Sequence, residues 1–238
     1  MTPPPPALQL SDVDFAWSAD GFGLRVADFT VERGETVLLL GASGSGKSTL
    51  LSLICGIVPA RSGRVSLLGQ NLDGLRPAAR DRLRADRIGV IFQMFNLLPY
   101  ATGLDNILLP LRFAPDRRAR AAESKADLQA EALRLAGALG LDAALMRNSP
   151  ASRLSVGQQQ RVAVARALIG SPPLIVADEP SSALDAEAEA GFLDLLFSQA
   201  HAAGASLVMV SHDPSLAPRF DRVVALSDIA VTRRGAAA

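Results

Sequence analysis

The sequence predicts an α/β fold with a mainly parallel sheet, an N-terminal antiparallel β region and a helical subdomain. Short, continuous apolar runs such as 35–40 and 174–177 are typical of parallel strands that are buried on both faces. Helix-forming segments separate these runs, and this alternation favours a parallel sheet with helices on both faces. The residues from Leu8 to Trp17 instead alternate between apolar and polar, which predicts an antiparallel strand.

Composition narrows the class of protein. The 238 residues balance 24 basic against 24 acidic side chains, so we expect no nucleic-acid partner held by bulk charge. The 49% hydrophobic content fits a packed globular chain, and no apolar run reaches the roughly 20 residues of a membrane span. The start, MTPPPPALQL, lacks the basic end and apolar stretch of a signal peptide. The single cysteine, Cys55, is expected to pack as a small apolar residue in a reducing compartment.

Local sequence patterns predict the strands and the helix of the N-terminal half. An extended pattern resumes at 29–32 after turn material around 20–23, and the leucine-rich run 35–40 ends at Gly41. The expected strands of this half are 8–17, 29–32, 35–40, 63–68 and 87–92, and a helix is expected over 48–57.

The C-terminal half begins with a long helical pattern from Asp105 to Met146. Within it, Leu128, Leu135 and Leu139 fall on one helical face, and the charged residues are expected to form a solvated face. The elements expected beyond it are a helix in 154–168, strands at 174–177, 206–210 and 222–226, and a helix at 186–203.

A phosphate-binding motif lies between an expected strand and an expected helix. Residues 41–48, GASGSGKS, match G-x-x-x-x-G-K-[ST] at every fixed position. Glycines let backbone N–H groups approach phosphate oxygens, Lys47 supplies a charge for the β- and γ-phosphates, and the Ser48 hydroxyl can bind Mg²⁺. The predicted phosphate site consists of Gly41, Ser43, Gly44, Ser45, Gly46, Lys47, Ser48 and Thr49.

Polar side chains follow three other expected strands. Asp178 and Glu179 end the run 174–177; an Asp at such a strand tip completes a Mg²⁺ shell, and an acid beyond it can accept a proton from water. With the phosphate motif upstream, this predicts a catalytic role and not a simple turn. His212 and Gln93 also follow apolar strands, at the edge where open α/β sheets bind ligands. A structural role is the alternative for both.

A second turn of small residues precedes a helix in LSVGQQQRVAVARAL, residues 154–168. With GASGSGKST, Gln93, LIVADEP, SSALD and His212 in this order, the chain resembles the ATP-binding cassette of ABC transporters from about Leu8 to Leu226. LSVGQ is similar to the family's signature, usually LSGGQ. The resemblance implies a single domain over 1–238 with a P-loop NTPase core. That core would span about 8–92 and 165–228, and a helical subdomain with the signature would span about 93–164.

The resemblance implies ATP hydrolysis with Mg²⁺ in a head-to-tail homodimer, where the signature of one subunit covers the γ-phosphate bound by the other. The implied roles are a general base (Glu179), a γ-phosphate contact (His212), a Mg²⁺ and water contact (Gln93), a Mg²⁺ partner (Asp178), nucleotide contacts from the opposite subunit (Ser155, Gly157 and Gln158) and a dimer-interface link (Asp185). Trp17 falls where the family places an aromatic that stacks on adenine, and a buried core tryptophan is the alternative.

One departure from the signature concerns Val156, which stands where the first glycine is usual. A β-branched residue resists positive φ, so a left-handed backbone here would weaken the dimer or slow turnover. Because Ser155 and Gly157 are retained, we expect Val156 to be harmless.

The stretch GVIFQMFNLLPYATGLDNILLPLRF is similar to cassettes that power lipoprotein release and macrolide export. Asp105 replaces the glutamate that commonly precedes the asparagine there. Residues 95–106 would form much of the groove for a permease coupling helix; for Leu97 and Leu98, ordinary core packing is equally open.

We therefore expect a peripheral protein on the cytoplasmic face of the inner membrane that drives separate permease subunits, as an exporter or lipoprotein-release ATPase. The alternatives are an importer ATPase, a non-transport cassette acting on ribosomes or DNA, and a regulatory module without turnover. The neutral charge and the lack of a coiled-coil insertion argue against the second, and Glu179 argues against the third.

Overall fold

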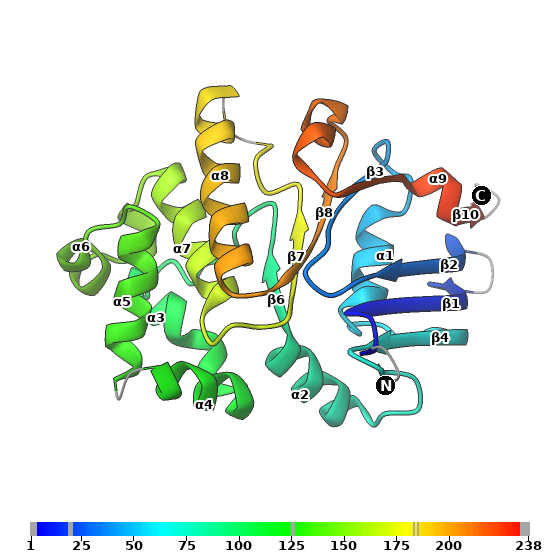
Figure 1. Cartoon of the computed structure of the whole chain (residues 1–238), viewed down its shortest axis with the longest axis horizontal. Helices are drawn as coiled ribbons and strands as arrows, with labels where there is room; N and C mark the ends of the chain where they lie inside the picture. The colour runs from blue at the N-terminus through cyan, green and yellow to red at the C-terminus, as the bar shows by residue number, and fades with distance from the viewer. Residues whose placement is uncertain (1–3, 19–20, 125–126, 183, 185, 234–238) are drawn as a thin grey trace. The chain divides into compact units, whose positions relative to one another are not determined.

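The computed structural model describes the whole chain except residues 1–3, 19–20, 125–126, 183, 185 and 234–238. Two compact units make up the structure, Met1–Arg84 with Ser206–Ala238, and Ala85–Ala205. The predicted α/β class is confirmed, because the structure combines parallel strands, an antiparallel sheet and helices (Figure 1). Among the described residues, none of the helices combines the length and apolar character that crossing a bilayer requires.

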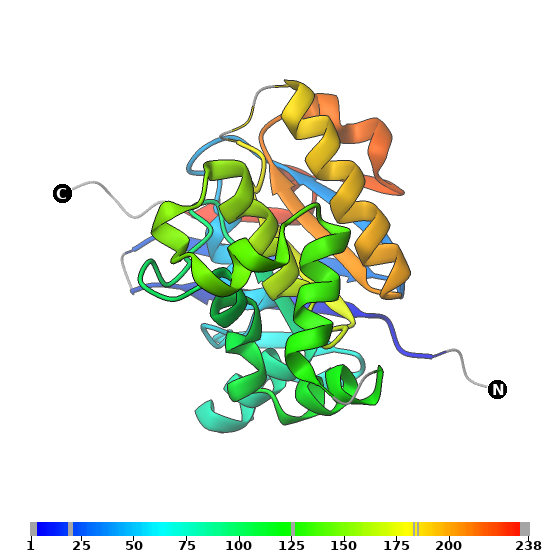
Figure 2. The ribbon, with the colours of Figure 1, turned by 90° about the vertical axis from the view of Figure 1, so that its left-hand side faces the viewer.

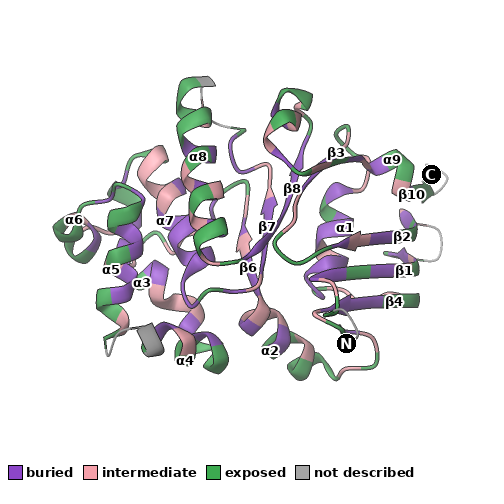
Figure 3. Ribbon diagram, in the orientation of Figure 1, coloured by how far each residue is buried: buried purple, intermediate pink, exposed green. Residues whose placement is uncertain are grey.

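The first unit contains an antiparallel sheet around β1 (Leu8–Ala16), which pairs with β2 (Gly23–Val31) as predicted. The strand order is β10-β2-β1-β4-β5, with β4 at Ser62–Leu67, β5 at Gln70–Asn71 and β10 at Ala230–Arg233. Buried side chains of β1 alternate up to Leu10 and resume at Val13 (Figure 3), because the register with β4 shifts in between and Asp12 has a φ of 50°. A side chain at Gly63 would place its Cβ 2.3 Å from the Asp12 carbonyl oxygen, so only glycine fits opposite this bulge.

The first unit also holds three parallel strands, with β3 (Thr36–Leu40) between β8 (Ser206–Ser211) and β9 (Arg222–Ala225). All of β8 is buried (Figure 3), which explains the apolar run LVMV between its two terminal serines. Helix α1 (Lys47–Ile54) follows β3. The remaining elements of this unit are η3 (Pro214–Arg219) and α9 (Leu226–Ile229).

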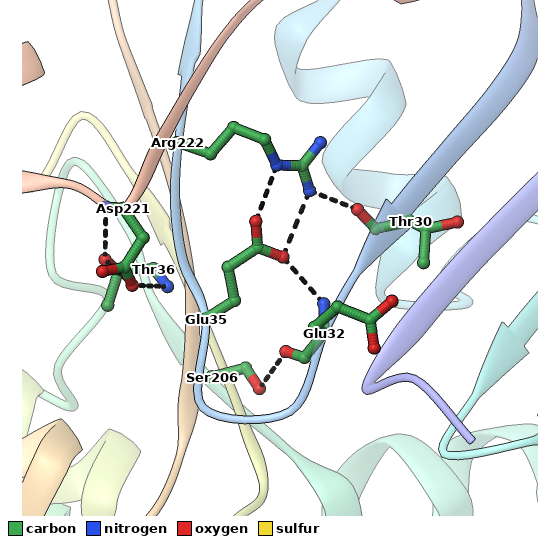
Figure 4. Close-up of polar contacts among 7 residues, drawn as sticks. All are labelled: Thr30, Glu32, Glu35, Thr36, Ser206, Asp221 and Arg222. Atoms are coloured by element: carbon green, nitrogen blue, oxygen red, sulfur yellow. Dashed lines mark hydrogen bonds and ion pairs between the residues drawn. The ribbon is translucent and has the colours of Figure 1, made fainter. Parts of the chain in front are cut away.

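Polar contacts fix the beginning of β3 (Figure 4). Arg222 Nε donates to Glu35 Oε1 at 2.6 Å, and the backbone N–H and hydroxyl of Thr36 both donate to Asp221 Oδ2 at 2.8 Å. The bonds from the Thr36 backbone and side chain lower the pKa of Asp221. The strand that leads to the phosphate-binding motif is therefore anchored at its start.

In the second unit, the parallel pair β6 (Ile88–Ile91) and β7 (Leu174–Asp178) is accompanied by helices. Helix α7 (Val156–Leu168) packs on β6, α3 and α5. Figure 2 shows the helices of this unit toward the viewer. The other elements are α3 (Gly103–Leu108), η1 (Leu109–Arg112), α4 (Pro115–Ser124), α5 (Leu128–Ala138), α6 (Ala143–Asn148), η2 (Ala151–Arg153) and α8 (Ala186–Ala202), and α2 (Pro77–Arg87) spans the boundary between the units.

The helical pattern expected over 105–146 is in fact broken into α3, η1, α4, α5 and α6. Pro110 and Pro115 lie at the starts of η1 and α4, where the backbone N–H that proline lacks would have no partner within the helix. Gly140 turns the chain after α5 with a φ of 70°. Leu135 and Leu139 are buried and Leu128 is half-buried, as their shared face predicted.

Candidate functional site

The phosphate-binding motif of the first unit forms a loop between β3 and α1. Its last glycine, Gly46, is the N-cap of α1 with a φ of 99°, and no side chain caps this helix. A Cβ at Gly46 would lie 2.9 Å from Phe22 Cζ, so both the backbone angle and the space require glycine. Helix α1 therefore begins with backbone N–H groups that no side chain occupies, which is the arrangement that binds anions.

Two side chains at this loop have the chemistry to bind an anion. Lys47 is buried, and its Nζ donates to the carbonyl oxygens of Gly41 at 2.7 Å and Ala42 at 3.2 Å. Within the described part of the chain, the buried Ser45 hydroxyl has no hydrogen-bond partner. A buried polar atom without a partner in a native loop calls for an explanation, and a phosphate oxygen would supply it. Ser48 is the second residue of α1 and is exposed.

Trp17 lies at the end of β1 and is 57% exposed, so the alternative of a core tryptophan is wrong. Its indole Nε1–H donates to Thr49 Oγ1 at 3.3 Å, and its ring meets Phe15 edge to face with the centroids 5.1 Å apart. These contacts connect the tryptophan to α1, and stacking on adenine stays a prediction for its ring.

His212 follows β8 in the same unit and is exposed. The backbone N–H of Gly41 donates to the carbonyl oxygen of Ser211 at 3.2 Å, so the end of β8 lies against the start of the phosphate loop. Beyond the histidine, Asp213 Oδ1 accepts from the Ser215 N–H at 2.8 Å, and this bond lowers the pKa of Asp213. The structure thus brings His212 and the phosphate loop together.

In the second unit, β7 ends with Asp178 and Glu179 follows it directly, and both predicted acids are half-buried. Glu179 has a φ of 42°, a left-handed conformation that costs a side chain about 1 to 2 kcal/mol. Gln160 of α7 holds the next residue, because its Nε2 donates to the Pro180 carbonyl oxygen at 2.7 Å. Gln93 Nε2 lies 3.4 Å from Ser182 Oγ, so the structure places Gln93 beside the segment that follows Glu179.

The signature segment begins α7 with a capping box. Ser155 Oγ accepts from the Gln158 N–H at 3.3 Å, and Gln158 Oε1 accepts from the Ser155 N–H at 2.9 Å. Val156 is the first residue of the helix and is not among the described non-glycine residues with positive φ. The backbone therefore carries no strain at Val156. A Cβ at Gly157 would meet nothing within 4 Å.

Sequence reasoning missed several residues that organise this unit. The side chains of Gln160 and Arg166 are buried on α7. Asn106 is fully buried, and Asp105 completes a capping box with Thr102 at the start of α3. The Asp that departs from the usual glutamate thus caps a helix. A polar residue inside an apolar helical stretch was the available signal for Arg166, whereas Gln160 stands among other polar residues and has no such signal.

The residues predicted for Mg²⁺ are Ser48 in the first unit and Gln93 and Asp178 in the second. Among the described residues, no three His, Cys, Asp or Glu side chains gather in a metal cluster. Mg²⁺ bound with a nucleotide needs only one or two carboxylates, with phosphate and water oxygens filling its shell. A hydroxyl, an amide and a carboxylate fit that requirement. Asp185, the predicted dimer-interface link, lies outside the described residues.

Known proteins are similar to this chain in sequence and in fold. The family model for ABC transporters matches residues 24–182. The uncharacterized ABC transporter ATP-binding protein YbbA of Escherichia coli K12 is 44% identical over 203 residues, which is 85% of each chain. The lipoprotein-releasing system ATP-binding protein LolD of Anaeromyxobacter dehalogenans is 44% identical over 205 residues, covering 86% of this chain and 82% of LolD.

Among solved structures, the ATP-binding cassette MJ0796 matches with a TM-score of 0.73 and 32% identity, covering 92% of this chain and 93% of that one; its structure is a post-hydrolysis dimer bound to ADP and Pi. The match to the family model covers more than half of the chain, and the motifs described above are divided between the two units. The chain therefore belongs to the ATP-binding cassettes of ABC transporters and is an ATPase.

Proposed function

We propose that this chain is the ATPase subunit of an ABC exporter or lipoprotein-release complex, which hydrolyses ATP to ADP and phosphate as a head-to-tail dimer. The observation that carries the nucleotide chemistry is the start of α1, where an uncapped helix end meets Lys47 and the unpartnered Ser45 hydroxyl. The likeness to LolD supports the type of complex, and the dimeric MJ0796 structure supports the assembly.

In this proposal the phosphate loop binds ATP within one chain. The N–H groups at the start of α1 hold the β- and γ-phosphates, and Lys47 moves its charge from the loop carbonyls to the phosphate oxygens. Trp17 offers its exposed ring to the adenine. Binding alone needs no second subunit.

Hydrolysis needs a positioned water. Glu179 accepts a proton as the water oxygen bonds to the γ-phosphorus, and the bond from that phosphorus to the β,γ-bridging oxygen breaks, leaving ADP and phosphate. Gln93 orients this water, and His212 donates to a γ-phosphate oxygen. Mg²⁺, held by Ser48, Gln93 and Asp178, would neutralise phosphate charge when bound.

The second subunit supplies the signature. Ser155, Gly157 and Gln158 contact the nucleotide held by the opposite chain, so that closure of two cassettes encloses two ATP molecules. The cycle of closure and reopening drives permease subunits at the cytoplasmic face of the membrane, through the surface at residues 95–106. On that surface Tyr100 is about 80% exposed, as is Met94 just before it, while Leu97 and Leu98 are half-buried.

Capture of the partner from membranes tests the type of complex. Tagged Glu179→Gln protein, incubated with ATP and Mg²⁺, is purified from detergent extracts of its host's membranes, and the retained proteins are identified by mass spectrometry. We expect a permease with few spans and a large extracytoplasmic domain. A many-span importer subunit would overturn the exporter assignment, and ribosomal or other soluble partners alone would overturn transport.

Two matched variants complete the experiment. Lys47→Met removes the phosphate charge and should abolish ATP-dependent closure. Steady-state ATPase of the captured complex should exceed that of Glu179→Gln by at least about a hundredfold, because a missing general base commonly costs that much. Equal rates would refute hydrolysis by this mechanism.

A further inference from the structure

The loop between β6 and α3, residues 92–102, is held by a buried arginine of the signature helix. We call it the glutamine loop because it begins with Phe92 and Gln93. Arg166 of α7 is 8% exposed; its Nη1 donates to the Asn96 carbonyl oxygen at 2.7 Å and its Nη2 to that of Phe95 at 2.5 Å. One planar guanidinium thus binds two successive carbonyl groups just beyond Gln93.

The bound segment has a strained backbone. Phe95 and Asn96 have φ values of 57° and 48°, and neither is glycine. Left-handed geometry is unfavourable for a residue such as Phe95, and it persists only where neighbouring groups enforce it. The two bonds from Arg166 are such an enforcing contact, because they fix the direction of both carbonyl groups.

The far end of the glutamine loop is fixed separately. Asn106 is fully buried, its Oδ1 accepts from the Leu98 N–H at 2.8 Å, and its Nδ2 donates to the Leu98 carbonyl oxygen at 3.1 Å. Between this anchor and β6, Arg166 is the described side chain that binds the strained carbonyl groups. Arg166 therefore binds the part of the glutamine loop that lies two and three residues beyond Gln93.

Helix α7 is itself anchored at the end that carries Arg166. Arg117 of α4 is buried; its Nη2 donates to the carbonyl oxygens of Ala167 at 2.9 Å and Ile169 at 2.7 Å, and its Nη1 to that of Ile88 at 3.3 Å. A cation at a helix C-terminus satisfies unpaired carbonyl groups and opposes the helix dipole. The pKa of Arg117 is lowered to about 9, mainly by burial and to a lesser extent by the positive charge of nearby Arg120. Arg117 therefore stays charged at neutral pH.

We propose that Arg166 is a positioning residue for hydrolysis, which holds Gln93 in register with the signature at the other end of the same helix. Helix α7 begins at the signature, binds the Pro180 carbonyl through Gln160, and binds the glutamine loop through Arg166. The three groups that must meet the nucleotide from this unit are thus attached to one helix. A displacement of the glutamine loop by a permease would reach Ser155 and Glu179 through α7.

A double-mutant cycle tests this inference, which rests on the proposed function. The captured complex is prepared with Arg166→Met, Gln93→Ala and both changes, and kcat and KM for ATP are measured. We expect Arg166→Met to lower kcat about tenfold, since bonds from a charged donor are lost, with KM within about twofold. In the Gln93→Ala background, Arg166→Met should leave kcat almost unchanged, because the Gln93 side chain that Arg166 positions is already missing. Arg166→Lys should recover part of kcat.

Arg120→Met is the matched control. Arg120 also binds carbonyl groups near the end of α7, those of Gly170 at 2.9 Å and Asp86 at 2.7 Å, without touching the glutamine loop in any described bond. The fold-changes in kcat caused by Arg120→Met and by Gln93→Ala should be independent, so that the double variant shows their product. If the Arg166→Met and Gln93→Ala effects also multiply, or if KM rises as much as kcat falls, Arg166 does not act through Gln93.

Hydrogen exchange gives a readout that does not depend on turnover. Arg166→Met should speed amide exchange in peptides covering 92–102 and leave peptides covering the phosphate loop unchanged, whereas Arg120→Met should not speed exchange in 92–102. Unchanged exchange in 92–102 would overturn the inference. A wild-type chain no more active than Glu179→Gln would instead refute the proposed function. If Arg166→Met fails to fold, Arg166→Lys enters the same cycle.

Discussion

The helices α1 and α7 both begin within a motif that contains small residues, but their N-termini are in different states. Gly46 begins α1 in a left-handed conformation with no side-chain cap. Ser155 and Gln158 cap α7 reciprocally, so two of its backbone N–H groups are already bonded within the chain. The first helix end is open to a ligand of its own chain, and the second is closed until something replaces its cap.

This difference fits the order of events in the proposed cycle. A capping box stabilises a helix by about 1 kcal/mol, a modest amount that contacts to a phosphate can replace. A single chain therefore keeps α7 stable while it binds ATP at α1. In the proposed cycle, the signature would exchange its own cap for a γ-phosphate only when a second cassette presents one.

The largest effect is expected for Ser155→Asp, which separates the two roles of the residue that caps α7. Aspartate caps helices as well as serine, so the free energy of unfolding should stay within about 0.5 kcal/mol of the wild type. Its charge would repel a γ-phosphate, and like charges in an interface cost several kcal/mol. ATP-driven dimerisation of the Glu179→Gln protein, measured by size exclusion with light scattering, should weaken at least about a hundredfold.

The matched variant is Ser155→Ala. It should lose about 1 kcal/mol of stability through the missing cap and weaken dimerisation less than aspartate does. ATP binding by the monomer, followed by quenching of the sole tryptophan, should be unchanged in both variants. Normal dimerisation of Ser155→Asp would show that the start of α7 does not meet a phosphate.

At α1, Gly46→Ala should weaken ATP binding by the monomer about tenfold. An alanine must adopt a φ of 99° or shift the phosphate loop, and left-handed geometry costs about 1 to 2 kcal/mol. Gly34→Ala is the control, since Gly34 has a φ of 76° and a Cβ there would meet nothing within 4 Å. The control should lose similar stability and keep its ATP affinity by tryptophan quenching. Equal losses of affinity would mean that general destabilisation, not loop geometry, is measured.

The contrast between the helix ends also shows what a sequence can predict. The position of the loop between β3 and α1 was predicted, because glycine positions and a strand followed by a helix are local signals. Most strands lie within a few residues of their predicted bounds, although β2 begins at Gly23 and not at residue 29. The capping box also has a local pattern, a serine followed three residues later by glutamine.

Other features depend on contacts between distant residues. The arginine-rich α2, without a clear apolar stripe, was not predicted, and neither were the two-residue β5 or the edge strand β10. The left-handed backbone at Phe95 and Asn96 is bound by Arg166, about 70 residues away, and no local pattern marks it. The prolines that divide 105–146 were visible, but the hydrophobic period continues across them.

A smaller effect at α1 is expected for Thr49→Val, which keeps the shape of a buried side chain and removes the acceptor for Trp17. The lost bond is long, at 3.3 Å, so ATP affinity should fall only about threefold. Ser52→Ala is the control, because its hydroxyl donates to the Ser48 carbonyl oxygen on the same helix. Tryptophan emission of the free protein should change in Thr49→Val and not in the control. Unchanged emission would show that Thr49 does not orient the indole.

The smallest effect is expected for Val156→Gly, which restores the usual signature. Val156 is helical and 53% exposed, so its backbone has no strain for glycine to relieve. Glycine in the first turn should lower the free energy of unfolding by up to about 1 kcal/mol, and the ATPase rate of the captured complex should change less than about twofold. An increase of fivefold or more would mean that the valine side chain meets the opposite subunit. The start of α7 would then be restricted twice, by its own cap and by Val156, and the contrast with α1 would be larger than the capping box alone makes it.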